Sequence, residues 1–104
     1  MKRYYFKMKL KPGCGDEYKK RHAEIWPELK GLLRIAGIED YSISFDKETN
    51  ILYASQKLPD DFEGEKLSNN PVMRKWWKYM ADIMETNEDA SPVCVELEEM
   101  FYLE

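Results

Sequence analysis

The stretch KRYYFKMKLKPG, residues 2–13, places an apolar side chain at every second position and then ends in proline and glycine. The apolar positions are Tyr4, Phe6, Met8 and Leu10, and most of the residues between them are basic. A period of two is typical of a β-strand with one buried face. Because Pro12-Gly13 is a turn signal, the sequence predicts a strand that ends there.

From about Asp16 the apolar period changes to that of a helix. One helical stripe collects Tyr18, His22, Ile25, Trp26, Leu29, Leu32, Leu33 and Ala36. Asp16 is the predicted N-cap, and Gly37 is predicted just after the helix end. A proline inside a helix removes a backbone hydrogen bond and costs about 3 kcal/mol. Pro27 therefore predicts a bent helix, or two helical pieces that meet near Trp26.

The rest of the chain continues with two strands, a second helix and a last strand. Residues 40–45 (DYSISF) and 51–58 (ILYASQKL) are predicted to form a hairpin around the turn DKETN. Residues 59–70 are predicted to hold a short helical turn and a loop. Asn70-Pro71 indicates an N-cap and first helical residue. The helix that follows has its apolar stripe at Val72, Met73, Trp76, Met80, Ile83 and Met84. After a loop over 85–92, residues 93–104 (VCVELEEMFYLE) are predicted to form the final strand.

The resulting order, β-α-β-β-α-β, is that of the ferredoxin-like α+β fold, with an antiparallel sheet and helices on one face. We expect residues 1–104 to form a single domain. The sheet face without helices needs a cover, and a second copy of the chain would supply one. The pattern therefore predicts a homodimer of the dimeric α+β barrel type.

Composition narrows the classes of function. The 16 basic and 20 acidic residues are spread along the chain and give a net charge of −4, so no basic surface for nucleic acid or anionic membrane is predicted. No segment approaches the roughly 20 apolar residues that span a bilayer, and no signal peptide is predicted. Cys14 and Cys94 form no metal or redox motif. We expect a cytoplasmic protein with two free thiols and no metal site.

The only histidine of the chain, His22, follows Tyr18 and precedes Trp26 at four-residue steps. Such spacing places all three side chains on one stripe of a helix. Histidine is the side chain best suited to transfer a proton near neutral pH. The alternative is a core histidine whose ring nitrogens bond to the backbone.

The string WWKYM, residues 76–80, contains two adjacent tryptophans. Neighbouring helical residues point about 100° apart, so Trp76 facing the sheet and Trp77 on its flank would form an L-shaped apolar wall. Such a wall suits the C–H face of a sugar, although both rings could simply pack. Tyr41 would face the helices if it shares the register of Ile43. These residues predict a cofactor-free pocket with one proton-transfer group, and they do not name its substrate.

Longer strings carry a more specific signal, and the sequence resembles the L-rhamnose mutarotase family over essentially its full length. The strings are EYKKRHAEIWPEL (17–29), YSISFDKETNILYA (41–54), WWKYMADIM (76–84) and SPVCVELEEMFYLE (91–104). The resemblance implies a homodimeric enzyme that interconverts the α and β anomers of L-rhamnopyranose without cofactor or metal. It also implies that His22 is the proton donor and that the sugar is bound by Tyr18, Tyr41, Trp76 and Trp77.

In the implied reaction His22 acts at the ring oxygen, and Tyr18 or an ordered water takes the anomeric proton. The chain departs from the family pattern at Ala23, where an asparagine is frequent, so a polar contact is expected to be missing there. Segment 59–71 matches poorly and receives no predicted function. Two other classes stay open: a non-catalytic sugar-binding module of this fold, and a cofactor-free monooxygenase-like protein, which fold analogy alone supports.

Overall fold

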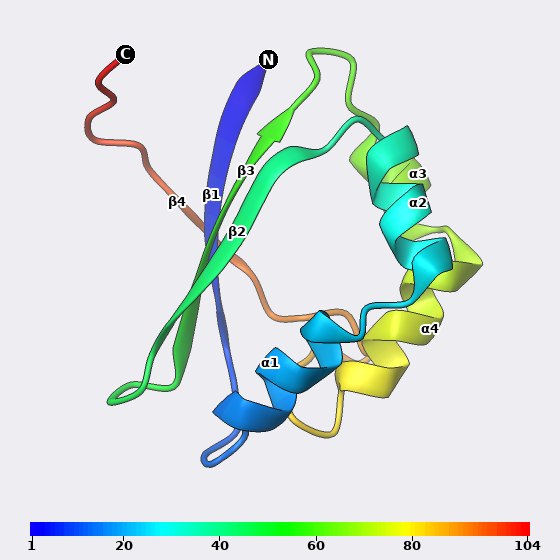
Figure 1. Ribbon diagram of the computed structural model, residues 1–104, viewed down its shortest axis with the longest axis vertical. Coiled ribbons are helices and arrows are strands. Elements are labelled where there is room, and N and C mark those ends of the chain that lie inside the picture. Colours follow the sequence, from blue (N-terminus) through cyan, green and yellow to red (C-terminus); the bar gives the residue numbers. More distant parts are fainter.

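A four-stranded antiparallel sheet carries all the helices on one of its faces in this computed structural model, which describes residues 1–104 (Figure 1). The strands are β1 (Lys2–Lys9), β2 (Glu39–Asp46), β3 (Ile51–Leu58) and β4 (Val95–Leu97). The helices are α1 (Gly15–Ala23), α2 (Pro27–Ile35), α3 (Gly64–Ser68) and α4 (Pro71–Met80). The strand order β2-β3-β1-β4 confirms the predicted ferredoxin-like α+β fold. No helix is both long and apolar enough to cross a bilayer.

The core lies between the sheet and the helices. On β1, Phe6 and Met8 are buried as the alternation predicts, and they pair with Ala54 and Leu52 of β3. The helices contribute Tyr18, Leu29, Met73, Trp76 and Met80. The pairing places Tyr4 beside Gln56 one step further along the same face. This face is therefore apolar in its middle and becomes polar toward one end.

The predicted break near Trp26 is confirmed. Trp26 has an extended backbone (ψ 133°), the conformation that a following proline favours. Pro27 is the first residue of α2, where a missing N–H leaves no hydrogen bond unmade. The chain thus avoids the cost of an internal proline by dividing one helix into two.

The predicted helix end at Gly37 is also confirmed. Gly37 has φ +87°, and its N–H donates to the carbonyl of Arg34 at 3.0 Å. The N–H of Ile38 donates to the carbonyl of Leu33 at 3.2 Å, which completes a Schellman motif. A side chain at Gly37 would also collide with Pro59, because its Cβ would lie 2.8 Å from the Pro59 ring.

The predicted N-cap at Asp16 is wrong. The N–H of Tyr18 donates to the carbonyl of Cys14 at 3.0 Å, so the helix begins earlier and Cys14 is the cap. No side chain accepts a hydrogen bond at this end. Asp16 lies instead in the first turn, where its charge is favourable near the positive end of the helix dipole.

Two predicted elements are shorter in the structure. Helix α4 ends at Met80, because the chain beyond it pairs with the end of β1: Lys11 donates to the carbonyl of Ile83, and Glu85 donates to that of Lys9. The last strand covers only residues 95–97 of the expected 93–104. Leu97 lies opposite Tyr5, so β1 ends within a few residues beyond this pair. The two glutamates Glu98 and Glu99 also interrupt the alternation of apolar and polar residues.

The cap of α4 gives a first prediction. The side chain of Asn70 accepts a hydrogen bond from the N–H of Val72 at 2.9 Å. Asn70→Ala is expected to lower the free energy of unfolding by about 1 kcal/mol, measured by urea denaturation. Asn69→Ala is the matched control, because the only hydrogen bond of the Asn69 side chain is the one it accepts from the exposed Arg74. An equal loss in both variants would contradict the assigned cap.

Candidate active site

A cavity of about 990 Å³ opens between the sheet and the helices. Its size falls in the usual range of small-molecule sites, roughly 300–1,000 Å³. All five residues predicted to act on a ligand line it: Tyr18, His22, Tyr41, Trp76 and Trp77. The structure therefore brings together residues from α1, β2 and α4, although their roles remain predictions.

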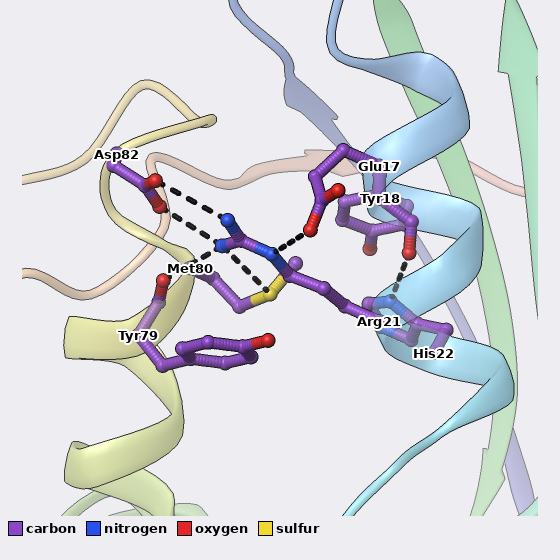
Figure 2. A network of polar contacts seen from close by, with 7 residues as sticks. All are labelled: Glu17, Tyr18, Arg21, His22, Tyr79, Met80 and Asp82. Carbon is purple, nitrogen blue, oxygen red and sulfur yellow. Dashed lines mark hydrogen bonds and ion pairs between the residues drawn. The ribbon is translucent and has the colours of Figure 1, made fainter.

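The rings of Tyr18 and His22 stack on one another along α1. Their centroids are 4.2 Å apart with an angle of 28° between the planes. The Nδ1 atom of His22 lies 3.1 Å from the carbonyl oxygen of Tyr18 (Figure 2). Because a carbonyl only accepts, this contact assigns the proton of a neutral ring to Nδ1. Nε2 then carries the free lone pair.

Burial lowers the pKa of His22 below its ordinary value of 6.5, and the hydrogen bond to the Tyr18 carbonyl opposes this shift only in part. A neutral imidazole therefore predominates at pH 7. The pKa of Tyr18 is raised, mainly by burial and further by the nearby Tyr41 and Cys94. The Tyr18 phenol is consequently a neutral hydrogen-bonding group at the same pH.

The paired tryptophans occupy the two orientations that the helical geometry predicts. Trp76 is buried against the core, and its ring meets that of His22 edge-on at 5.4 Å. Trp77 is half-buried and lines the cavity. Trp26 does not line the cavity, and its ring packs edge-on against Trp76 at 5.1 Å. Trp26 thus supports the wall from behind.

Tyr41 reaches the cavity from an irregular part of β2. The β2–β3 register shifts between Glu39 and Ser42, and Asp40 has φ +47°. The ring of Tyr41 lies 6.3 Å from that of Phe6. Burial raises the pKa of its phenol, even though 40% of the residue is exposed. The hydroxyl of Tyr41 is therefore also neutral at pH 7.

Arg21, next to His22, fixes α1 against the end of α4 (Figure 2). Its Nε atom donates to Glu17 at 2.7 Å, and Nη1 donates to the Tyr79 carbonyl at 2.8 Å. Its two Nη atoms donate to both carboxylate oxygens of Asp82, at 2.9 and 3.2 Å. The guanidinium also lies over the Tyr79 ring at 4.5 Å. The sequence alone did not indicate this positioning role, because Tyr79 and Asp82 are 58 and 61 positions from Arg21.

Several other residues of the cavity were missed. Gln56 lines it from β3, and Cys94 lines it from the segment before β4. The segment 59–71, which received no predicted function, contributes Phe62, Gly64, Leu67 and Ser68.

Ala23, where a missing contact was expected, is exposed and does not line the cavity. No three His, Cys, Asp or Glu side chains are placed to hold a metal ion. Cys14 and Cys94 are free thiols, as predicted.

Comparisons with known proteins identify the family of the chain. A family model described as L-rhamnose mutarotase matches residues 3–103. The L-rhamnose mutarotases of Bacteroides thetaiotaomicron and Phocaeicola vulgatus are 57% and 55% identical to the chain, with full coverage of both sequences in each case. The crystal structure of the L-rhamnose mutarotase of Formosa agariphila superposes with a TM-score of 0.93 at 51% identity, again over both full chains. The chain belongs to the L-rhamnose mutarotase family.

Proposed function

We propose that this protein is a cofactor-independent isomerase that interconverts the α and β anomers of L-rhamnopyranose, a step in rhamnose metabolism. Two observations carry the proposal. The chain belongs to the L-rhamnose mutarotase family, and His22 lines a cavity walled by aromatic rings while its Nε2 atom has no hydrogen-bond partner in the protein. Neutral imidazole exchanges protons readily near pH 7. The whole of residues 1–104 is proposed to act as one mutarotase-like domain, since the family match covers 3–103.

In the proposed complex the sugar lies against the tryptophan wall. The C–H face of the pyranose and its apolar C6 methyl suit the rings of Trp76 and Trp77. The phenols of Tyr18 and Tyr41 are neutral, so each can both donate to and accept from a sugar hydroxyl. This arrangement orients the anomeric carbon toward His22.

Ring opening moves one proton and breaks one bond. The anomeric hydroxyl loses its proton, its oxygen forms the aldehyde C=O, the C1–O5 bond breaks, and O5 gains a proton. Rotation about the C1–C2 bond and reversal of these steps on the other face give the other anomer. No electron acceptor or nucleophile is consumed, and a positioned acid–base group typically contributes about 10²–10⁴-fold.

The protonation state of His22 bears on the order of these steps. The family resemblance assigns His22 as the donor to the ring oxygen. A resting neutral ring supports the view that Nε2 first accepts the anomeric proton and, once charged, is the acid that protonates O5. O1 and O5 are bonded to the same carbon, so one nitrogen is close to both. Because its pKa is raised, Tyr18 stays protonated at pH 7 and is not available as a base, so we assign it to sugar binding.

The pH profile tests this order. If neutral His22 is the reactive form, kcat/KM for anomer exchange is expected to be constant above about pH 6.5 and to fall with one proton as pH drops through the lowered pKa of His22. Because His22 is the only histidine, its ring proton signals give this pKa independently by NMR titration. Activity that increases as pH falls through that pKa would instead identify the imidazolium as the reactive form.

A non-catalytic sugar-binding module is the alternative from another class. Saturation-transfer NMR on L-rhamnose measures anomer exchange, and quenching of tryptophan fluorescence measures binding. Accelerated exchange supports the enzyme. Fluorescence change without exchange would support the binding module and contradict the proposed reaction. Repeating both measurements with fucose and mannose establishes which aldoses are accepted.

A homodimer is proposed on two surfaces. The outer sheet face lies opposite the helices (Figure 1). The strand registers place Tyr5, Tyr53, Val95 and Leu97 on this face. The C-terminal segment exposes Met100, Phe101, Tyr102 and Leu103. Exposed apolar side chains on a sheet face without helices are typical of subunit contacts. Sedimentation equilibrium is expected to give twice the chain mass of 12.4 kDa, and a mass of one chain would contradict the dimer.

The two free thiols support a reducing cytoplasmic location.

A further inference from the structure

Gln56 is a polar residue in an otherwise apolar core. It is 7% exposed, and every other buried residue is hydrophobic. It follows Leu52 and Ala54 at two-residue steps on β3, so it lies on the face of the sheet that meets the helices. Its partner on the neighbouring strand β1 is Tyr4. On the other side of β3 lies the irregular part of β2 that contains Tyr41.

The side-chain amide of Gln56 has no hydrogen-bond partner in the protein, although buried amides normally have one. Every fully buried side-chain nitrogen or oxygen in the protein has a hydrogen-bond partner. The unpaired amide of Gln56 is therefore not fully enclosed by protein, and the residue lines the cavity. Its polar atoms therefore open onto the space in which a ligand would lie. Such an amide destabilises the folded protein and gains its hydrogen bonds only from water or a ligand.

The chemistry of the amide indicates the kind of group that it binds. One end donates through N–H and the other accepts through C=O. Two adjacent hydroxyls match this pair, one accepting and one donating, and aldoses carry such hydroxyls along the ring. A carboxylate or phosphate would engage only the donor end.

We propose that Gln56 is a specificity-determining residue that hydrogen-bonds ring hydroxyls of the sugar from the sheet side of the cavity. The proposal rests on the proposed function, because it takes the same sugar in the same cavity. Gln56 lies on the sheet, whereas His22 lies on α1 in the opposite layer. The sugar hydroxyls that Gln56 binds are therefore remote from the reacting C1. Loss of Gln56 then affects binding of the ground state and the transition state alike, which raises KM and leaves kcat nearly unchanged.

The test compares Gln56→Leu with wild type on L-rhamnose and on its 2-, 3- and 4-deoxy analogues. Gln56→Leu is expected to raise KM for L-rhamnose about tenfold, with kcat within about threefold of wild type. For the two analogues that each lack one of the bound hydroxyls, the difference in KM between the two proteins is expected to be smaller than for L-rhamnose. Ser55→Ala, at the neighbouring outward position of β3, is the matched control and should leave all values unchanged.

Stability separates this role from a structural one. An amide that is unpaired in the free protein is not needed for folding, so Gln56→Leu is expected to unfold at an equal or higher temperature than wild type. A lower midpoint would identify a structural glutamine and overturn the proposal. An unchanged KM for L-rhamnose, or a KM increase of equal size for every deoxy sugar, would also overturn it.

The two proposals fail in distinguishable ways. If wild type does not accelerate anomer exchange, the proposed reaction fails, and dissociation constants from tryptophan fluorescence then test Gln56 alone. About tenfold weaker binding of L-rhamnose in Gln56→Leu, with a smaller effect for two of the deoxy sugars, would support the residue's role in sugar recognition. Equal dissociation constants for all sugars would overturn it.

Discussion

His22→Asn is expected to lower the acceleration of anomer exchange by about 10²–10⁴-fold, the usual contribution of a positioned acid–base group. The asparagine amide can still donate to the Tyr18 carbonyl, which His22 Nδ1 contacts at 3.1 Å. It lacks an atom in the place of Nε2, so only the proton-transfer group is removed. The measurement is saturation-transfer NMR at saturating L-rhamnose.

Sugar binding provides the control for this variant. The tryptophan wall and the two phenols remain in His22→Asn, so the dissociation constant from fluorescence quenching is expected to stay within about threefold of wild type. A loss of exchange together with a loss of binding would point to a damaged cavity. Exchange within about threefold of wild type, in a folded and sugar-binding variant, would remove His22 from the mechanism.

Arg21→Met is expected to lower the free energy of unfolding by about 2–3 kcal/mol, from lost hydrogen bonds and the lost contact with Tyr79. The Arg21 side chain is only 11% exposed, and it donates to Glu17, Asp82 and the Tyr79 carbonyl. Both carboxylates are substantially exposed, so solvent weakens the ion pairs, and the expected loss is well below that of a buried pair. Urea denaturation measures the change.

A matched arginine is available on α2. Arg34 is exposed, and its side chain has no hydrogen bond or ion pair, so Arg34→Met is expected to change stability by less than about 0.5 kcal/mol. Arg21→Met is also expected to reduce exchange, because α1 presents His22 and is fixed to α4 through Arg21. Similar stability losses in both variants would contradict the assigned network.

Most of the fold could be predicted from local patterns. The alternation over residues 2–11 and the helical stripe after Asp16 are both decided within a few neighbouring residues, and so is the break before Pro27. The cap of α1 was misplaced by two residues, whereas the two errors of element length arose where distant segments meet. Ile83 and Met84 continue the apolar stripe of α4, yet pairing with β1 keeps them outside the helix. The last strand is short because its register leaves only Lys2, Arg3 and Tyr4 of β1 beyond residue 97, far fewer than the expected strand to residue 104 would need.

Local patterns also predicted part of the cavity. Tyr18 and His22 share a helical stripe, and Trp76-Trp77 is a rare pair, so the residues themselves indicated a site. Gln56 also left a local signal, since it is a polar residue at an inward position of the strand that holds Leu52 and Ala54. Arg21 and Cys94 left none, because their importance depends on contacts far along the chain.

The most direct test of anomer interconversion uses a freshly dissolved single anomer of L-rhamnose. Its optical rotation drifts slowly to an equilibrium value without a catalyst. A catalytic amount of the protein at pH 7 is expected to shorten this drift in proportion to its concentration and to leave the final rotation unchanged. An unchanged time course, with sugar binding demonstrated by tryptophan fluorescence in the same sample, would contradict the proposed enzyme.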